Sequence, residues 1–245
     1  MFENLLTLSA IVIFNLKGKI QEFHGENMYF NDDQTAQLNH LIRKIEQRTG
    51  IELVAAVVGK CDSYPEVPWK AFALTVAAVA LIHLIQTIAR PDWITIWSVQ
   101  LALVFVLGAG AAVALLSVFW PAFGRLFLNR LRTETEAEQY ARALFLEKEL
   151  FKTRTRTGIL ILISLFERTV VIVPDSGVAS RLDSKALQAV ISQMTPDLRK
   201  GDRFQALTRG LSALEAGLVQ TGFGPSRESD DQIKDTLIEK KGEDR

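Results

Sequence analysis

Two long stretches without any formal charge lie next to each other in the middle of this sequence. The first covers residues 71–89 and the second covers residues 93–124, with a short connector between them. A helix needs about 20 apolar residues to cross the hydrocarbon core of a bilayer, so the first stretch meets this length and the second exceeds it. The sequence therefore predicts a transmembrane hairpin over residues 69–120, with helices at about 70–89 and 94–119.

The tryptophans support a membrane location for this hairpin. All four lie at the ends of the two stretches: Trp69 and Trp120 at the outer ends, Trp93 and Trp97 at the turn. Indole rings favour the headgroup level of a bilayer, and two buried helices of a soluble core would not place every tryptophan at a boundary. The lipid bilayer is therefore the first expected partner of this chain.

The basic residues predict the orientation of the hairpin. Five of them flank its outer ends: Lys60, Lys70, Arg125, Arg130 and Arg132. Arg90 alone lies in the turn. Because positively charged flanks stay on the cytoplasmic side, both soluble parts and both termini are predicted to face the cytoplasm.

Composition excludes several classes of function. Lys plus Arg and Asp plus Glu both count 28, so the formal net charge is zero and the basic excess expected of a nucleic-acid-binding protein is missing. Cys61 is the single cysteine, which rules out an intrachain disulfide and a zinc site built from cysteines. It has no basic neighbour except Lys60, so a reactive thiol is not expected.

The soluble parts on either side of the hairpin predict one α/β domain. Before the hairpin, the apolar spacing predicts a helix at 32–48, capped by Asn31, and a buried strand at 51–58. A lone strand leaves its backbone groups unpaired, so its partners are expected after the hairpin, at 159–165 and 169–173. Further helices are expected at 134–151, 184–194 and 203–219.

This order of elements predicts a small mixed β-sheet covered by helices on both faces, a three-layer sandwich. Its first part is expected at 29–66 and its second part at 125–221. Residues 1–28 are an N-terminal extension of unclear structure, in which the apolar run 5–14 is a strand, an interfacial anchor or a segment outside the fold. Residues 222–245 are rich in charge and predict a disordered tail or a solvated helix.

Several stretches resemble the TPM domain family, in the branch that carries membrane helices within the domain. Before the hairpin these are KIEQRTGIELVAAV and CDSYPEVPWKA, and after it ARALFLEKELFKTRTRTGILILISLFERTVVIVPDSGV. The most specific feature is the pair of apolar strands followed by Asp175 and Gly177. The resemblance covers about 29–64 and 134–219, and it implies a small sheet with helices on both faces.

The same resemblance implies a range of functions. Members of the wider family have been linked to acid phosphatase activity, divalent-cation binding, photosystem repair and modulation of membrane receptors. Soluble members often carry an Asp-Asn-Gly loop before the two strands, whereas this chain has Thr155-Arg156-Thr157-Gly158. A loop that loses its carboxylate and gains an arginine is a poorer ligand for Ca²⁺ or Mg²⁺. The cation cofactor and metal-assisted phosphatase chemistry are therefore in doubt.

The candidate site lies where the two paired strands begin and end. The start of one antiparallel strand lies beside the end of its neighbour, so Asp175 is expected within reach of Arg156 and Thr157. Asp175 is then the candidate phosphate-accepting nucleophile or metal ligand, and Arg156 the candidate oxyanion holder. The candidate binding residues are Thr153, Thr157, Gly158, Ser176 and Gly177. The structural alternative is an Asp–Arg pair with ordinary turn chemistry at 175–177.

Three functions follow as hypotheses. The first is a membrane-anchored accessory, chaperone-like or quality-control module that binds other membrane proteins, with catalysis not expected. The alternative is a membrane-bound acid phosphatase-like hydrolase, with Ca²⁺ or Mg²⁺ as its candidate cofactor. The third is a cation sensor, whose melting temperature Ca²⁺ or Mg²⁺ would raise. Outside the candidate site, Glu167 and Arg168 are predicted to be an exposed pair in the turn between the strands.

Overall fold

The chain divides into two compact units, each described here by itself. A computed structural model describes residues 10–13, 29–89, 96–225 and 237–242. The α/β unit is drawn from Met1–Asp62 and Leu131–Arg245, and the hairpin unit is Ser63–Arg130. The hairpin unit thus follows directly on the first buried strand of the α/β unit.

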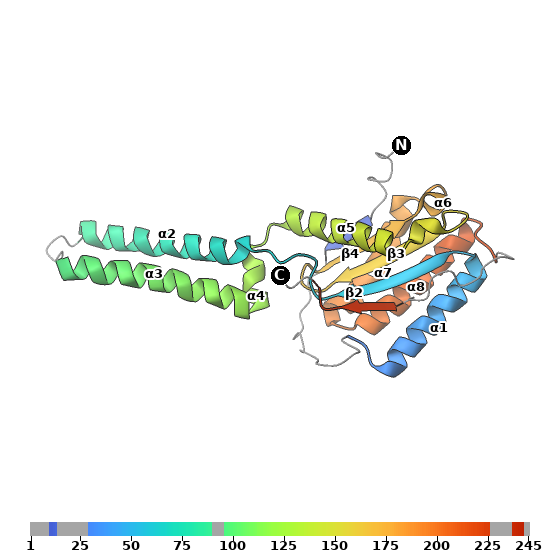
Figure 1. The fold of residues 1–245 in the computed structure, drawn as a ribbon, viewed down its shortest axis with the longest axis horizontal. Coiled ribbons are helices and arrows are strands. Elements are labelled where there is room, and N and C mark those ends of the chain that lie inside the picture. The colour runs from blue at the N-terminus through green and yellow to red at the C-terminus, as the bar shows by residue number, and fades with distance from the viewer. Residues whose placement is uncertain (1–9, 14–28, 90–95, 226–236, 243–245) are drawn as a thin grey trace. The chain divides into compact units, whose positions relative to one another are not determined.

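A five-stranded mixed sheet forms the centre of the α/β unit (Figure 1). Its strands are β1 (Ala10–Ile13), β2 (Glu52–Val58), β3 (Gly158–Ser164), β4 (Thr169–Pro174) and β5 (Leu237–Lys240), in the order β1-β4-β3-β2-β5. β2 runs parallel to β3 and β5, while β4 is antiparallel to β3 and β1. The prediction that the strand before the apolar hairpin pairs with strands after it is confirmed.

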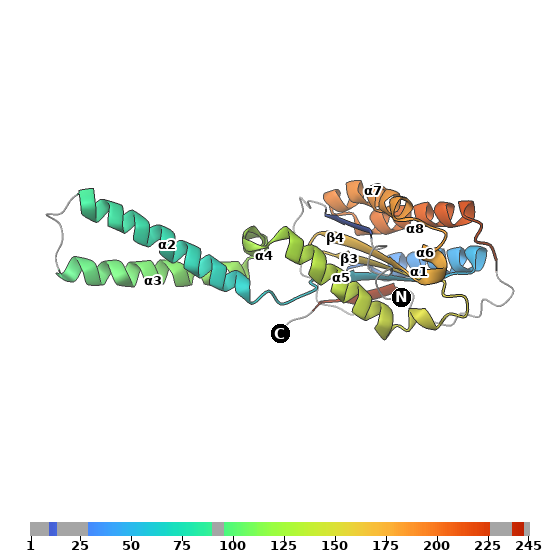
Figure 2. The same ribbon diagram turned by 90° about the horizontal axis from the view of Figure 1, so that it is seen from above.

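Helices cover both faces of this sheet, which makes three layers (Figure 2). On one face lie α1 (Asp32–Thr49), α7 (Ser184–Lys200) and α8 (Arg203–Gln220), and on the other lies α5 (Arg130–Glu147). Alternate residues of β2, β3 and β4 enter the two cores. In β2, Leu53, Ala55 and Val57 pack with the first group of helices, and Val54, Ala56 and Val58 pack with α5. Burial on both faces explains why the strand reads as continuously apolar.

The helix ends follow local capping chemistry. Asn31 and Gln34 form the expected reciprocal capping box at the start of α1, and Gly50 ends the helix at φ 67°. α7 continues beyond the predicted end at residue 194, through Pro196, to the left-handed cap at Gly201. It continues because Leu198 keeps the apolar face buried, which outweighs the one hydrogen bond that a proline removes.

The two ends of the chain contribute edge strands to the sheet. Of the three alternatives for residues 5–14, the strand is the one observed, at Ala10–Ile13, and the rest of that run lies outside the described residues. The tail differs from the expected disorder because Leu237–Lys240 form β5. Ile238 is buried on the α5 side of the sheet, and Leu237 packs against the core on the other side. These two apolar residues anchor β5 within a charged segment.

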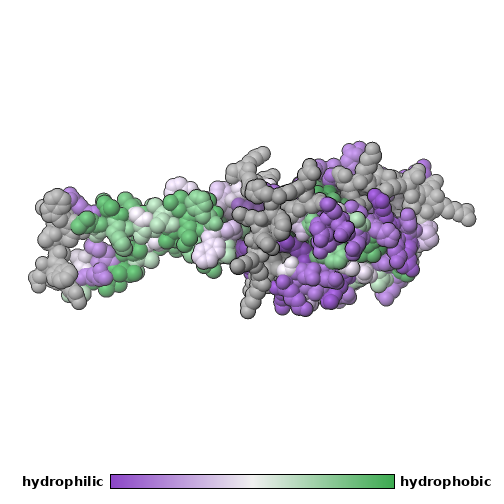
Figure 3. All heavy atoms as spheres, turned by 90° about the horizontal axis from the view of Figure 1, so that it is seen from below, coloured by the Kyte–Doolittle hydropathy of each residue, from purple (hydrophilic) through white to green (hydrophobic). Residues whose placement is uncertain are grey.

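The hairpin unit contains two long apolar helices. α2 (Glu66–Ala89) and α3 (Ile96–Phe119) are long and apolar enough to cross a membrane, and their most apolar windows are only 6% and 11% buried. Figure 3 shows that their surface is hydrophobic over most of its length. The two helices pack closely at Gly110, where an added Cβ would lie 2.6 Å from Cγ2 of Val76. The short helices α4 (Pro121–Gly124) and η3 (Arg125–Phe127) follow.

Candidate functional site

Asp175 lies directly after β4 and is almost completely buried. It is 1% exposed and caps the short helix α6 (Ser176–Ala179), where its Oδ1 accepts a hydrogen bond of 2.7 Å from the backbone N–H of Ser176. Its own backbone N–H donates to the carbonyl of Gly158 at 2.8 Å. The end of β4 is therefore tied to the start of β3, as the antiparallel pairing predicts.

Arg156 approaches this carboxylate from the loop that precedes β3. Its Nε lies 3.4 Å from Asp175 Oδ1, and its Nη1 donates a 2.7 Å hydrogen bond to the carbonyl of Phe151. The arginine side chain is 47% exposed, in contrast to the buried carboxylate. Arg156 adopts φ 56°, in the left-handed region that non-glycine residues rarely occupy. The structure thus brings the two candidate catalytic residues together.

The candidate binding threonines are used within the loop itself. The backbone N–H of Thr157 donates to Oγ1 of Thr153 at 2.9 Å, and the backbone N–H of Arg156 donates to the Thr153 carbonyl at 3.1 Å. Both threonines are buried, at 7% and 8% exposure. Their hydroxyls therefore shape the loop, and ligand binding by them remains a prediction.

The two candidate glycines let backbone segments approach each other closely. A Cβ at Gly158 would lie 2.5 Å from the carbonyl oxygen of Leu150, and one at Gly177 would lie 2.4 Å from that of Thr155. The backbone N–H of Gly177 also donates to the carbonyl of Arg156 at 2.9 Å. At the start of α6, the backbone N–H of Ser176 thus binds Asp175, and Gly177 contacts the loop that carries Arg156.

The burial of the second carboxylate oxygen of Asp175 argues against a role of this residue as a nucleophile. Oδ2 is buried and has no hydrogen-bond partner among the described residues. A carboxylate nucleophile needs open space in front of the attacking oxygen, with the reacting atoms about 3–3.5 Å apart. In this geometry Oδ2 has no such space, and Oδ1 faces Ser176 and Arg156. The arrangement holds a charge pair better than it presents a nucleophile.

The residues at this site do not fit the divalent cation that the TPM resemblance implies. Ca²⁺ and Mg²⁺ bind to several oxygen ligands, with carboxylates prominent among them. The loop offers hydroxyls and Asp175 the one carboxylate, and a guanidinium already faces that carboxylate. Across the described part of the chain, three or more His, Cys, Asp or Glu side chains nowhere gather as a metal site would require.

Glu167 corrects one prediction, because it is buried rather than exposed. It is 5% exposed, its Oε1 accepts a 2.9 Å hydrogen bond from the backbone N–H of Cys61, and its Oε2 accepts one from the Ser164 hydroxyl. Glu167 thus caps the other end of the sheet, where the chain leaves β2. A weak signal was present in the sequence, since Ser164 stands three residues before it.

This environment predicts that Cys61 is unreactive in the folded protein. Burial, and then the charge of Glu167, raise the pKa of the Cys61 thiol. We expect maleimide to modify Cys61 at pH 8 about 10²-fold more slowly in the folded chain than in urea, because the reaction requires local opening. Mass spectrometry over time measures both rates. Equal rates would contradict the buried position.

The raised pKa of Cys61 makes the stability of the folded chain decrease at high pH. The folded chain retains the thiol proton at a pH where the unfolded chain loses it. The contribution of Cys61 to stability is therefore complete below the ordinary thiol pKa of about 8.5, and it declines as the pH rises further towards the raised pKa of the folded state. Denaturation of the wild type and of Cys61→Ser between pH 7 and about 10 measures this decline, which should be confined to the wild type.

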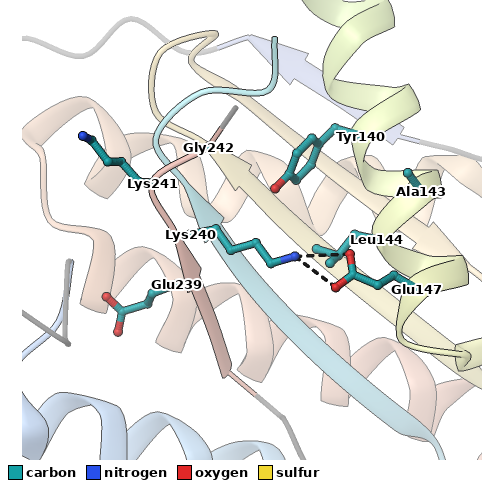
Figure 4. Close-up of a pocket in the computed structure, with 8 residues that line it drawn as sticks. All are labelled: Tyr140, Ala143, Leu144, Glu147, Glu239, Lys240, Lys241 and Gly242. Atoms are coloured by element: carbon teal, nitrogen blue, oxygen red, sulfur yellow. Dashed lines mark hydrogen bonds and ion pairs between the residues drawn. The ribbon is translucent and has the colours of Figure 1, made fainter. Parts of the chain in front are cut away.

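A pocket of about 570 Å³ lies between α5 and the edge strand β5 (Figure 4). Tyr140 and Glu147 of α5 point toward Lys240 of β5, whose Nζ lies 3.1 Å from Glu147 Oε1. Glu239 points to the other face and accepts a hydrogen bond from the backbone N–H of Tyr29 at 2.5 Å. The sequence did not predict this pocket, because half of it is built from the segment expected to be disordered.

The fold and the strand-end site define a class of protein: an α/β sandwich with a hydrophobic helical hairpin inserted after its first buried strand. The family model of the TPM domain matches residues 126–217, which confirms the TPM resemblance for that part of the chain. No curated protein matches the sequence. The chain is also similar to the NMR structure of the BA42 protein from the psychrophilic bacterium Bizionia argentinensis. That match has a TM-score of 0.53 and 11% identity and covers 88% of this chain and 98% of that one, so it supports the fold alone.

Proposed function

We propose that this chain is an integral membrane protein whose TPM-type domain serves as an accessory module for other membrane proteins. The observation that carries the proposal is the outward surface of α2 and α3. Large apolar side chains lie exposed along it, including Ile88 at 73%, Val104 at 70% and Phe105 at 68%. A surface of this size needs lipid or other membrane helices to cover it.

The strand-end site does not present the accessible carboxylate that catalysis needs. The only charged partner that the described contacts give Asp175 is Arg156, and its second oxygen is buried. In addition, the pocket beside β5 adds a concave surface on the same unit. A folded domain anchored in a bilayer is concentrated near other membrane proteins, so weak contacts suffice for an accessory role.

The basic flanks of the hairpin support a cytoplasmic position for the α/β unit. Reporter domains inserted after Arg90 and fused after Arg245 measure this orientation directly. The first reporter should lie outside the cytoplasm and the second inside. An external reporter after Arg245 would overturn the cytoplasmic assignment.

Site-specific photo-crosslinking in intact membranes tests the accessory role. A photoreactive residue at Val104, which is 70% exposed, should yield adducts with defined membrane proteins. The matched control is Val106, which is only 9% exposed on the same helix and should yield no intermolecular adducts. Adducts with lipid and abundant bulk proteins alone, from both positions, would refute the accessory role.

The second candidate is a phosphatase, favoured by the contact between Arg156 and Asp175. In this reading Arg156 holds an oxyanion and Asp175 accepts the phosphoryl group after its loop moves. Phosphate release by the detergent-purified chain tests it, together with Asp175→Asn. The matched control is Asp183→Asn, because Asp183 also caps a helix but lies outside the site. Release that is lost only in Asp175→Asn would establish the enzyme, and we expect no release above a mock purification.

A further inference from the structure

We infer that the guanidinium of Arg156 is the permanent cation of the strand-end site and takes the place of a divalent cation there. The guanidinium neutralises the buried carboxylate at the end of β4 and holds the adjoining loop, whichever partners the chain binds. The α/β unit therefore folds and remains stable without Ca²⁺ or Mg²⁺.

The first step is electrostatic. Asp175 is 1% exposed, and a buried carboxylate is costly unless a positive charge and hydrogen bonds compensate it. The Ser176 N–H supplies one hydrogen bond, and the Arg156 guanidinium, 3.4 Å away at Nε, supplies the charge. A divalent cation at the same carboxylate would lie within a few ångströms of the guanidinium and be repelled by it.

The second step is geometric, because Arg156 joins two segments as a bound metal ion would. Through Nε it contacts the end of β4, and through Nη1 it donates to the carbonyl of Phe151, before the loop. The planar guanidinium presents several donors in a fixed arrangement, which suits such a bridge. The bridge thus spans the loop between Phe151 and Gly158, which Gly177 also contacts through its hydrogen bond to the Arg156 carbonyl.

The third step concerns the backbone. Arg156 holds φ 56°, a conformation that is unfavourable for a non-glycine residue and that asparagine tolerates better. The side-chain contacts of Arg156 to Asp175 and to the carbonyl of Phe151 compensate this backbone cost. Replacement by asparagine relieves the backbone and removes the cation, so a net loss of stability comes from the removed cation.

Thermal unfolding of the full chain in detergent tests the inference, with a thiol-reactive dye on Cys61 as the readout. This cysteine is the single one and is buried in the α/β unit, whereas all four tryptophans lie at the ends of the apolar stretches. The variants are Arg156→Asn and Arg156→Lys, and the matched control is Lys185→Asn, which removes an exposed positive charge from α7. Each is measured with CaCl₂, MgCl₂ or EDTA at equal ionic strength.

We expect the wild-type melting temperature to be the same in all three solutions. Arg156→Asn should melt at least about 2–4 °C lower in EDTA, Arg156→Lys should fall between it and the wild type, and Lys185→Asn should match the wild type. Two results would overturn the inference. One is a wild-type melting temperature that rises with Ca²⁺ or Mg²⁺ and falls with EDTA. The other is an Arg156→Asn chain at least as stable as the wild type, which would show that the guanidinium contributes no more than the backbone relief that asparagine supplies.

Discussion

Gly177→Ala is expected to destabilise the α/β unit by about 1–3 kcal/mol, the usual cost of forcing an atom into a packed site. The new Cβ would lie 2.4 Å from the carbonyl oxygen of Thr155 and 2.6 Å from that of Arg156. Both are backbone atoms, so no flexible side chain can move aside. Alanine favours the helical backbone of α6 by up to about 1 kcal/mol, and the two contacts outweigh that gain. The melting temperature of the full chain, followed through Cys61, should fall by about 2–4 °C for each kcal/mol.

Gly224→Ala is the control for this prediction. Among the described residues beyond its chain neighbours, no heavy atom lies within 4 Å of a Cβ built at Gly224, so this change should leave the melting temperature unaltered. The pair of variants separates a steric contact from a general effect of removing glycine. If Gly177→Ala melted at the wild-type temperature, the loop carrying Arg156 would not rest on the start of α6, and the described site geometry would be wrong.

Phe105→Arg is expected to prevent stable membrane insertion of the hairpin. Phe105 lies near the middle of α3 and is 68% exposed. An arginine near the centre of a transmembrane helix costs about 2.5–3.5 kcal/mol on the insertion scale, and the apolar ring is lost in addition. On a helix that faces water, the same change would be neutral or would increase solubility. The fraction of chain that stays in membranes after carbonate extraction measures the difference.

Two controls accompany this variant. Phe105→Leu keeps the helix apolar and should insert like the wild type. Leu146→Arg places the same charge on an exposed apolar position of α5, where Leu146 is 61% exposed, and should be tolerated because water covers that surface. A Phe105→Arg chain that accumulates as soluble, folded protein would contradict the membrane location of α2 and α3.

The candidate site was predictable in part because it is built from near neighbours. Antiparallel pairing of two strands joined by a short turn places the residue after the second strand beside the residues before the first. That rule alone puts Asp175 next to Arg156, and the structure has them 3.4 Å apart. The burial of Asp175 Oδ2 could not be predicted from the sequence, because it depends on how the surrounding elements pack over this oxygen.

Glu167 shows where the same reasoning fails. A charged residue in a short turn is normally exposed, so the sequence favours an exposed pair with Arg168. In the structure, β2 and β3 pair in parallel and bring the backbone N–H of Cys61 to the carboxylate of Glu167. The hydrogen bond measures 2.9 Å, although the two residues are 106 positions apart in sequence. A buried donor at the end of one strand needs an acceptor, and only the folded sheet shows which side chain supplies it.

The sequence by itself determined the two apolar helices, the order of the elements, the capping of α1 and the pairing of β2 with strands beyond the hairpin. These features follow from charge, periodicity and backbone hydrogen bonding, which act along the chain or between adjacent segments. Only the tertiary structure decided that β1 and β5 complete the sheet, that Glu167 is buried and that Oδ2 of Asp175 is buried with no hydrogen-bond partner among the described residues. The physical reason is that burial is a property of the packed assembly, so a side chain's exposure depends on residues far from it in sequence.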